Sequence, residues 1–150
     1  MRNPVVLFCI VAFLAAACGQ REQSSAEVHG RQDQSSAEVQ WIQDDFQAAS
    51  TLAAQEGKLI FIDFYADWCP PCRTLSDEYF PRDDYQSFLS GFVALKVNVD
   101  NVPDLAGNYG VSSIPTLIIT DADGNELDRV IGITGSPEDF LETLGSMATE

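Results

Sequence analysis

The feature that most constrains the fold is a nine-residue run, KLIFIDFYA at residues 58–66, which two cysteines follow closely along the chain. A continuous β-prone run of this kind is typical of a strand buried on both faces of a sheet. The segment from Cys69 onward predicts a helix that continues to about Tyr79 and is broken at Pro81. Cys69 and Cys72 are therefore expected at a strand-to-helix junction in an α/β fold.

The remaining segments extend this unit into a larger sheet. Apolar spacing and turn residues predict a short strand at 39–42, a helix at 44–58 stopped by Gly57, a short helix at 83–91, a buried strand at 92–100, a helix or turn at 102–110, two strands joined by a hairpin across 113–133 with its loop at 121–125, and a last helix from Ser136 through Leu144. This order predicts an α/β fold with a central mixed β-sheet of four to five strands and helices on both faces.

The N-terminus has the pattern of an export signal at residues 1–17. One basic residue, Arg2, precedes an apolar run that small residues close, and the run is too short for a comfortable bilayer span. Alanines at 15–17 fit an ordinary signal peptidase, and the same stretch before Cys18 resembles a bacterial lipobox, although Ala15 stands where Leu is usual. We expect Cys18 to be the lipidated first residue, with plain secretion and an uncleaved anchor as alternatives. Each outcome predicts a periplasmic or other extracytoplasmic location.

Residues 18–38 predict a flexible linker, and residues 39–150 form the predicted folded domain. The linker is rich in Gln, Ser and Glu, and the hexapeptide QSSAEV occurs in it at 23–28 and again at 34–39. The whole chain has a formal net charge of −15. Nucleic acid and anionic lipid surfaces are poor partners for such a chain, so we expect membrane attachment through the lipid alone, and a monomer.

The two-residue spacing of Cys69 and Cys72 admits several kinds of site. Haem attachment needs a histidine where Arg73 stands, and zinc needs two further ligands, whereas the only histidine, His29, lies in the linker. A structural bridge across so short a loop removes little chain entropy. Two-coordinate Cu(I) stays open. The predicted export and the strand-to-helix context favour a redox-active dithiol that uses no metal and no cofactor.

The helix start suggests different roles for the two cysteines. Cys69 lies at the helix N-terminus, where free N–H groups favour a thiolate, so we expect it to attack, with a more buried Cys72 resolving the mixed disulfide. Pro70 and Pro71 rigidify this turn and carry no N–H, which leaves the Cys72 amide as the nearest backbone donor to the Cys69 sulfur. No basic residue lies between the cysteines and Asp67 is near, so we expect a moderately lowered thiol pKa, which favours a reductant.

Three segments in order resemble motifs of the thioredoxin family: D-F-Y-A-D-W-C-P-P-C at 63–72, K-V-N-V-D at 96–100 and Y-G-V-S-S-I-P-T at 109–116. The resemblance covers about residues 41–145. It implies the thioredoxin fold and the following roles: Asp63 as the buried acid that assists proton transfer at Cys72, Lys96 as its neighbour, Trp68 packed beside the active site, Ile114 and Pro115 as the cis-proline loop that binds a substrate strand, and Gly132 near the same surface.

Within the family, the chain looks most like the thioredoxin-like C-terminal domain of the membrane reductase DsbD. That likeness implies a protein-disulfide reductase acting on exported thiol and disulfide proteins. The electron-delivery membrane domain of DsbD has no counterpart in this sequence, so electrons would come from a separate membrane or periplasmic donor, or the protein would act as an oxidant or isomerase. The alternative from another class is a non-enzymatic module that binds copper or a partner protein.

Overall fold

The computed structural model describes residues 38–147. The predicted signal at 1–17, the lipidation site Cys18 and nearly all of the linker lie outside the described residues. Among the helices of the described part, none is both long and apolar enough to cross a bilayer.

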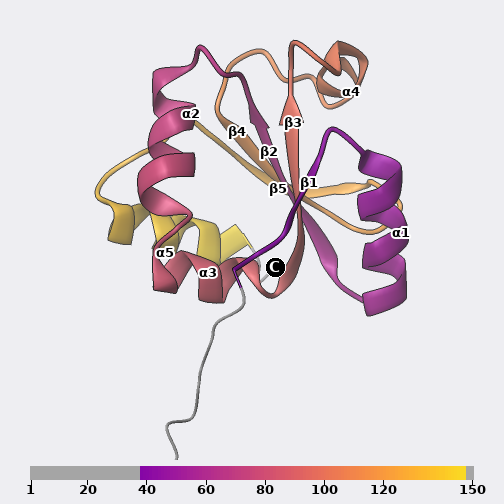
Figure 1. Ribbon diagram of the computed structural model, residues 1–150, viewed down its shortest axis with the longest axis horizontal. Helices are drawn as coiled ribbons and strands as arrows, with labels where there is room; N and C mark the ends of the chain where they lie inside the picture. Colours follow the sequence, from indigo (N-terminus) through magenta and orange to yellow (C-terminus); the bar gives the residue numbers. More distant parts are fainter. Residues whose placement is uncertain (1–37, 148–150) are drawn as a thin grey trace, which may run out of the picture. The chain divides into compact units, whose positions relative to one another are not determined.

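A five-stranded mixed sheet forms the centre of the domain (Figure 1). Its strand order is β1 (Trp41–Gln43), β3 (Phe92–Asn98), β2 (Leu59–Tyr65), β4 (Thr116–Thr120) and β5 (Glu126–Ile131). The first three run parallel, whereas β4 pairs antiparallel with both β2 and β5. The strand predicted from the apolar run is thus the middle strand of the sheet.

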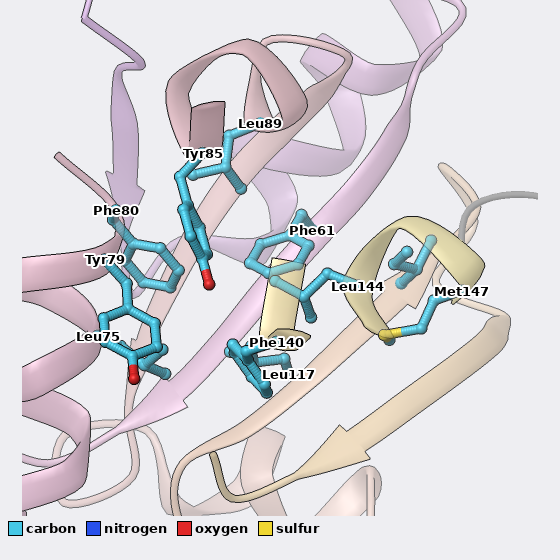
Figure 2. Packing of buried hydrophobic residues seen from close by; sticks show 11 residues of the cluster. Phe61, Leu75, Tyr79, Phe80, Tyr85, Leu89, Leu117, Phe140, Leu144 and Met147 are labelled. Atoms are coloured by element: carbon cyan, nitrogen blue, oxygen red, sulfur yellow. The ribbon is translucent and has the colours of Figure 1, made fainter. Parts of the chain in front are cut away.

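Helices cover both faces of this sheet, as predicted. On one face, α1 (Phe46–Glu56) and α4 (Pro103–Asn108) pack on Ile60, Ile62 and Phe64 of β2. The other face is covered by α2 (Pro70–Thr74), α3 (Asp83–Leu89) and α5 (Pro137–Met147). A second cluster there contains Phe61 of β2 and side chains of α3 and α5 (Figure 2). Because side chains alternate along a strand, Asp63 shares the face of Phe61 and points toward the α2 side.

Several helix ends follow signals visible in the sequence. Gly57 ends α1 in the left-handed conformation, with φ of 64°. At the start of α5, the Ser136 hydroxyl accepts from the Asp139 amide at 3.2 Å and the Asp139 carboxylate accepts from the Ser136 amide at 3.0 Å. This capping box is the predicted helix start. The helix continues past the predicted end at Leu144 to Met147, because both side chains are buried in the core.

The helix that follows the cysteines changes form halfway. After α2 the chain continues as a π-helical turn, η1 (Leu75–Tyr79), and the Phe80 amide donates to the Leu75 carbonyl at 2.8 Å. The predicted extent of this helix is right, but the wider turn was not predicted. Leu75, Tyr79 and Phe80 are all buried in the core beneath α2 and η1, so packing against the sheet accompanies the change of pitch.

Candidate redox site

The two cysteines lie where β2 ends and α2 begins, and they form a disulfide with 2.23 Å between the sulfurs. Cys69 is the N-cap of α2, and its sulfur accepts from the Cys72 amide at 3.4 Å. Pro70 and Pro71 occupy the first helical positions and have no N–H to donate. The Cys72 amide is therefore the donor to the Cys69 sulfur, as predicted from the two prolines.

Both cysteines are buried. Cys69 is 3% exposed and Cys72 is 1% exposed, so the expected difference in burial has the right sign but is small. Tyr65, Val99 and Ile114 pack against them. Little of the Cys69 side chain is therefore accessible while the disulfide is formed.

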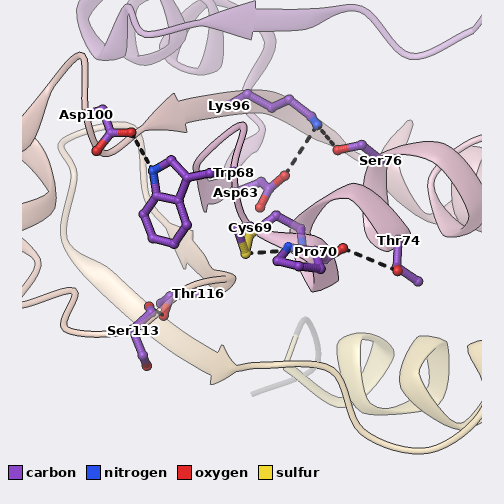
Figure 3. Close-up of a disulfide and its surroundings, with 11 residues drawn as sticks. Asp63, Trp68, Cys69, Pro70, Thr74, Ser76, Lys96, Asp100, Ser113 and Thr116 are labelled. Atoms are coloured by element: carbon purple, nitrogen blue, oxygen red, sulfur yellow. Dashed lines mark hydrogen bonds and ion pairs between the residues drawn. A yellow bond between two sulfur atoms is a disulfide. The ribbon is translucent and has the colours of Figure 1, made fainter.

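Asp63 and Lys96 are direct neighbours in the β2–β3 register. Asp63 is fully buried, and its nearest Lys96 contact, from Nζ to Oδ2, is 3.5 Å. Neither carboxylate oxygen of Asp63 has a hydrogen-bond partner, whereas the Lys96 ammonium donates to the hydroxyl of Ser76 (Figure 3). Burial raises the pKa of Asp63 to about 6, against the opposing attraction of Lys96. A carboxyl with this pKa can exchange a proton near neutral pH.

Three aromatic rings surround the Lys96 ammonium. Its Nζ lies 5.3 Å from the ring centroid of Trp41, 5.0 Å from that of Tyr65 and 5.5 Å from that of Phe80. The Lys96 side chain is only 12% exposed. Neither these rings nor Ser76 were predicted as site residues. Ser76 lies on η1, and no sequence signal indicated its contact with Lys96, because the direction of the Ser76 side chain depends on the π turn.

Trp68 lies near the disulfide but outside the core (Figure 3). It is 65% exposed, and its indole Nε1 donates to the Asp100 carboxylate at 2.8 Å. The resemblance implied a Trp68 packed beside the active site, and the indole lies on that side, exposed and held by this one hydrogen bond. Asp100 was missed as a site residue. A signal existed, because Trp68 and Asp100 follow adjacent parallel strands, whose carboxyl ends meet at one edge of the sheet.

The loop before β4 completes this edge. The Ile114–Pro115 peptide bond is cis, and the Pro115 carbonyl accepts from the Gly132 amide at 2.8 Å. Gly132 has φ of 79°, a conformation that favours glycine, and an added Cβ there would meet nothing within 4 Å. The backbone conformation, not a lack of space, is therefore the physical reason for glycine beside Pro115.

Two hollows border the cysteine pair. The first, which we call the Trp68 groove, has a volume of about 370 Å³ and is lined by Trp68, Val99, Val111, Ser112, Ser113 and Ile114. The second, the Cys72 hollow, has a volume of about 380 Å³ and is lined by Tyr65, Ala66, Asp67, Cys72, Arg73, Ser76 and Asp77. The groove therefore brings Trp68 and Ile114 together on one side of the disulfide. Within residues 38–147 no cluster of three or more His, Cys, Asp or Glu side chains could hold a metal ion.

A family model described as a thioredoxin-like domain matches residues 46–148. The chain belongs to this family. Among curated relatives, the thioredoxin of Chlamydia caviae is 45% identical over 75 residues, which are 50% of this chain and 70% of the relative. The thioredoxin H-type of Oryza sativa subsp. indica is 39% identical over 88 residues, covering 59% of this chain and 69% of the relative.

Solved structures agree with this thioredoxin-like assignment. A putative disulphide-isomerase from Bacteroides thetaiotaomicron superposes with a TM-score of 0.64 at 29% identity, covering 75% of this chain and 94% of that one. The DsbH oxidoreductase superposes with a TM-score of 0.63 at 20% identity, covering 87% of this chain and 94% of that one. At this identity the likeness shows the fold alone. The predicted family and fold are confirmed, and the thioredoxin-like protein is a thiol–disulfide oxidoreductase. The closer likeness to the DsbD domain stays a prediction.

Proposed function

We propose that this thioredoxin-like protein is an exported protein-disulfide reductase, anchored by a lipid on Cys18, that reduces disulfides of other exported proteins. The observation that carries the proposal is the arrangement around the dithiol: the Cys69 sulfur accepts a backbone N–H at a helix start, and the buried Asp63 carboxyl, with a pKa of about 6, lies behind the pair. The Cys72 amide at the helix start favours a thiolate on Cys69, and the Asp63 carboxylate can take a proton from Cys72.

The reaction begins with both cysteines reduced. The Cys69 thiolate attacks one sulfur of the partner's disulfide; that S–S bond breaks, and the other partner sulfur leaves as a thiolate, which takes a proton from water. Cys72 then transfers its proton to the Asp63 carboxylate and attacks the Cys69 sulfur of the mixed disulfide. The partner leaves with both sulfurs reduced, and the protein is left with the Cys69–Cys72 disulfide seen in the structure. Two electrons from an upstream donor restore the dithiol.

The direction of net flux is argued from charge. The dipeptide between the cysteines is Pro70-Pro71 and carries no cation, and the nearest exposed ionisable neighbours in the chain are Asp67 and Arg73. An oxidant of this family type needs a strongly stabilised thiolate, because that stabilises its reduced form. One amide at 3.4 Å, with no cation between the two cysteines, supplies only modest stabilisation of Cys69. This favours the reductant.

The reduction potential of the pair tests the direction. The full chain is equilibrated with glutathione buffers, the thiols are alkylated, and the peptide carrying Cys69 and Cys72 is quantified by mass spectrometry, so that Cys9 and Cys18 do not contribute. A value near −270 mV, at the thioredoxin end of the known range, supports the reductase. A value near −120 mV makes the protein an oxidant and overturns the proposed direction.

Trapping tests the enzyme against a non-enzymatic module. In the exporting cell, Cys72→Ala is expected to accumulate mixed disulfides between Cys69 and partner proteins, and a Cys69→Ala/Cys72→Ala double variant accumulates none. Absence of any trapped species with Cys72→Ala contradicts the reductase. The anchor is tested separately: Cys18→Ser is expected to move the protein from the membrane fraction to the soluble exported fraction.

A further inference from the structure

Carboxylates dominate the surface around the disulfide. Asp67 and Asp77 line the Cys72 hollow, and Asp100 lies at the Trp68 groove through its hydrogen bond to the indole. All three residues are exposed. Among the described residues, Arg73 is the only cationic side chain that lines either hollow. A partner that docks at these two hollows beside the cysteine pair therefore meets three negative charges and one positive charge.

The other basic residues of the described part do not offset these carboxylates. The Lys96 ammonium is 3.5 Å from Asp63, donates to Ser76 and belongs to a side chain that is only 12% exposed. The three others are engaged in ion pairs away from the hollows: Lys58 with Glu56, Arg82 with Asp84 and Glu138, and Arg129 with Glu126. The acidic excess at the hollows is thus left for a partner to neutralise.

We propose that this face selects partner segments that carry Lys or Arg beside the reacting cysteine. The inference rests on the proposed reductase and names the substrate class for its site: cationic peptide segments that contain a disulfide. Apolar contact is available to such a segment in the Trp68 groove, where Val99, Val111 and Ile114 form the lining. Its basic side chains then lie near Asp67, Asp77 and Asp100. Opposite charges of this kind mainly accelerate productive encounter and discriminate against acidic partners.

A single-turnover assay isolates the exchange step. The full chain is reduced with dithiothreitol, desalted and mixed with one of three peptides that differ only in four residues flanking an intramolecular disulfide: all Lys, all Gln or all Glu. Each turnover breaks the peptide S–S bond, forms the Cys69–Cys72 S–S bond and moves two electrons from protein to peptide. Acid quenching and chromatography give the rate constant. A Cys69→Ser variant corrects for reduction by Cys9 and Cys18.

Flanking charges also change the intrinsic reactivity of a disulfide. The rate constant for each peptide is therefore divided by its rate constant with dithiothreitol, whose only charge is that of the reacting thiolate. After this normalisation the Lys peptide is expected to react roughly five- to ten-fold faster than the Glu peptide at low ionic strength, with the Gln peptide between them. The ratio is expected to fall below about two-fold in 1 M salt, where the Debye length is about 3 Å. Equal normalised rates at low salt overturn the inference.

Charge variants test whether these particular residues set the preference. A triple variant, Asp67→Asn with Asp77→Asn and Asp100→Asn, is expected to reduce the Lys-to-Glu ratio to about two-fold or less. Asn at position 100 still offers an acceptor to the Trp68 indole. Arg73→Gln is expected to raise the ratio, because it removes the one cation of the hollows. A second triple variant, Glu38→Gln with Asp123→Asn and Glu142→Gln, removes three exposed acids that line neither hollow; it is the matched control and is expected to leave the ratio unchanged.

The outcomes separate this inference from the proposed function. If none of the three peptides is reduced above the Cys69→Ser background, the reductase itself fails. If all three are reduced at one normalised rate, the reductase stands and the charge selection fails. If the control triple variant lowers the ratio as much as the triple variant at the hollows, the preference belongs to the net charge of the whole protein, and the assignment to this face is wrong.

Discussion

Replacing Asp63 by Asn is expected to stabilise the protein at neutral pH. The pKa of Asp63 is about 6 in the folded state, because burial opposes ionisation, against 3.8 as the ordinary value. The protonated carboxyl therefore contributes stability that is present below the unfolded pKa and is lost as pH rises through the folded pKa. A difference of about two pKa units corresponds to about 3 kcal/mol. Asn resembles the protonated carboxyl in shape and does not ionise, so the variant does not lose this stability.

The expected pH window follows from the same two pKa values. The difference in unfolding free energy between Asp63→Asn and the parent protein is expected to be near zero at about pH 3, to grow with a midpoint near pH 5 and to level off near 3 kcal/mol above about pH 7. The attraction of Lys96 is already contained in the folded pKa, so its partial loss in the variant needs no separate correction. The pH at which this difference in unfolding free energy grows therefore tests the two pKa values, and its plateau tests the difference between them.

Urea denaturation of the full chain, with the disulfide intact and in buffers from pH 3 to pH 8, measures the curve. Asp123→Asn, an exposed acid in the β4–β5 loop, is the control and is expected to change the curve by no more than a few tenths of a kcal/mol. A constant difference across the pH range would refute the reasoning, as would an Asp63→Asn protein that is less stable than the parent at pH 7.5. Either result would mean that the buried carboxyl is solvated or paired in solution.

Three further substitutions have expected outcomes. Gly124→Ala is expected to destabilise the fold by about 2 kcal/mol in the same urea assay, because Gly124 has φ of 88° and an added Cβ would lie 2.9 Å from the ring of Phe46 in α1. The control is Gly107→Ala, since an added Cβ there would meet nothing within 4 Å. Phe61→Ala, fully buried between rings, is expected to destabilise by about 3–5 kcal/mol in urea. Asp100→Ala is expected to speed solvent exchange of the Trp68 Nε1–H measured by NMR, whereas Asp100→Asn keeps an acceptor and leaves it slow.

Features encoded within a few neighbouring residues could be predicted from the sequence. The buried strand, the cysteine N-cap of α2 and the capping box at Ser136 each depend on local propensity, missing proline amides or short-range hydrogen bonds. That Asp63 and Lys96 are neighbours was implied by the resemblance of their motifs to the thioredoxin family, and the β2–β3 register pairs them. The fold class and the position of the dithiol could therefore be predicted from the sequence.

Features set by packing between distant elements could not be predicted in this way. The π turn at η1 accompanies the burial of residues against the sheet, and the Lys96–Ser76 bond in turn depends on that turn. The exposure of Trp68 is another example, since the sequence next to a buried strand is compatible with either a buried or an exposed aromatic side chain. Its partner Asp100 was within reach of sequence reasoning, because adjacent parallel strands bring their carboxyl ends together.

The order of strands in the sheet has a consequence for a chain that is still being synthesised. The central strand β2 and both cysteines precede their neighbours β3 and β4 in the sequence, and the Ile114–Pro115 loop comes later than either cysteine. A nascent chain that ends at Asp100 contains Cys69 and Cys72 without this loop and without the antiparallel neighbour of β2. Its cysteines lack the packing of Ile114 and are therefore open to any oxidant present, and this shielding begins only when the last third of the chain has folded.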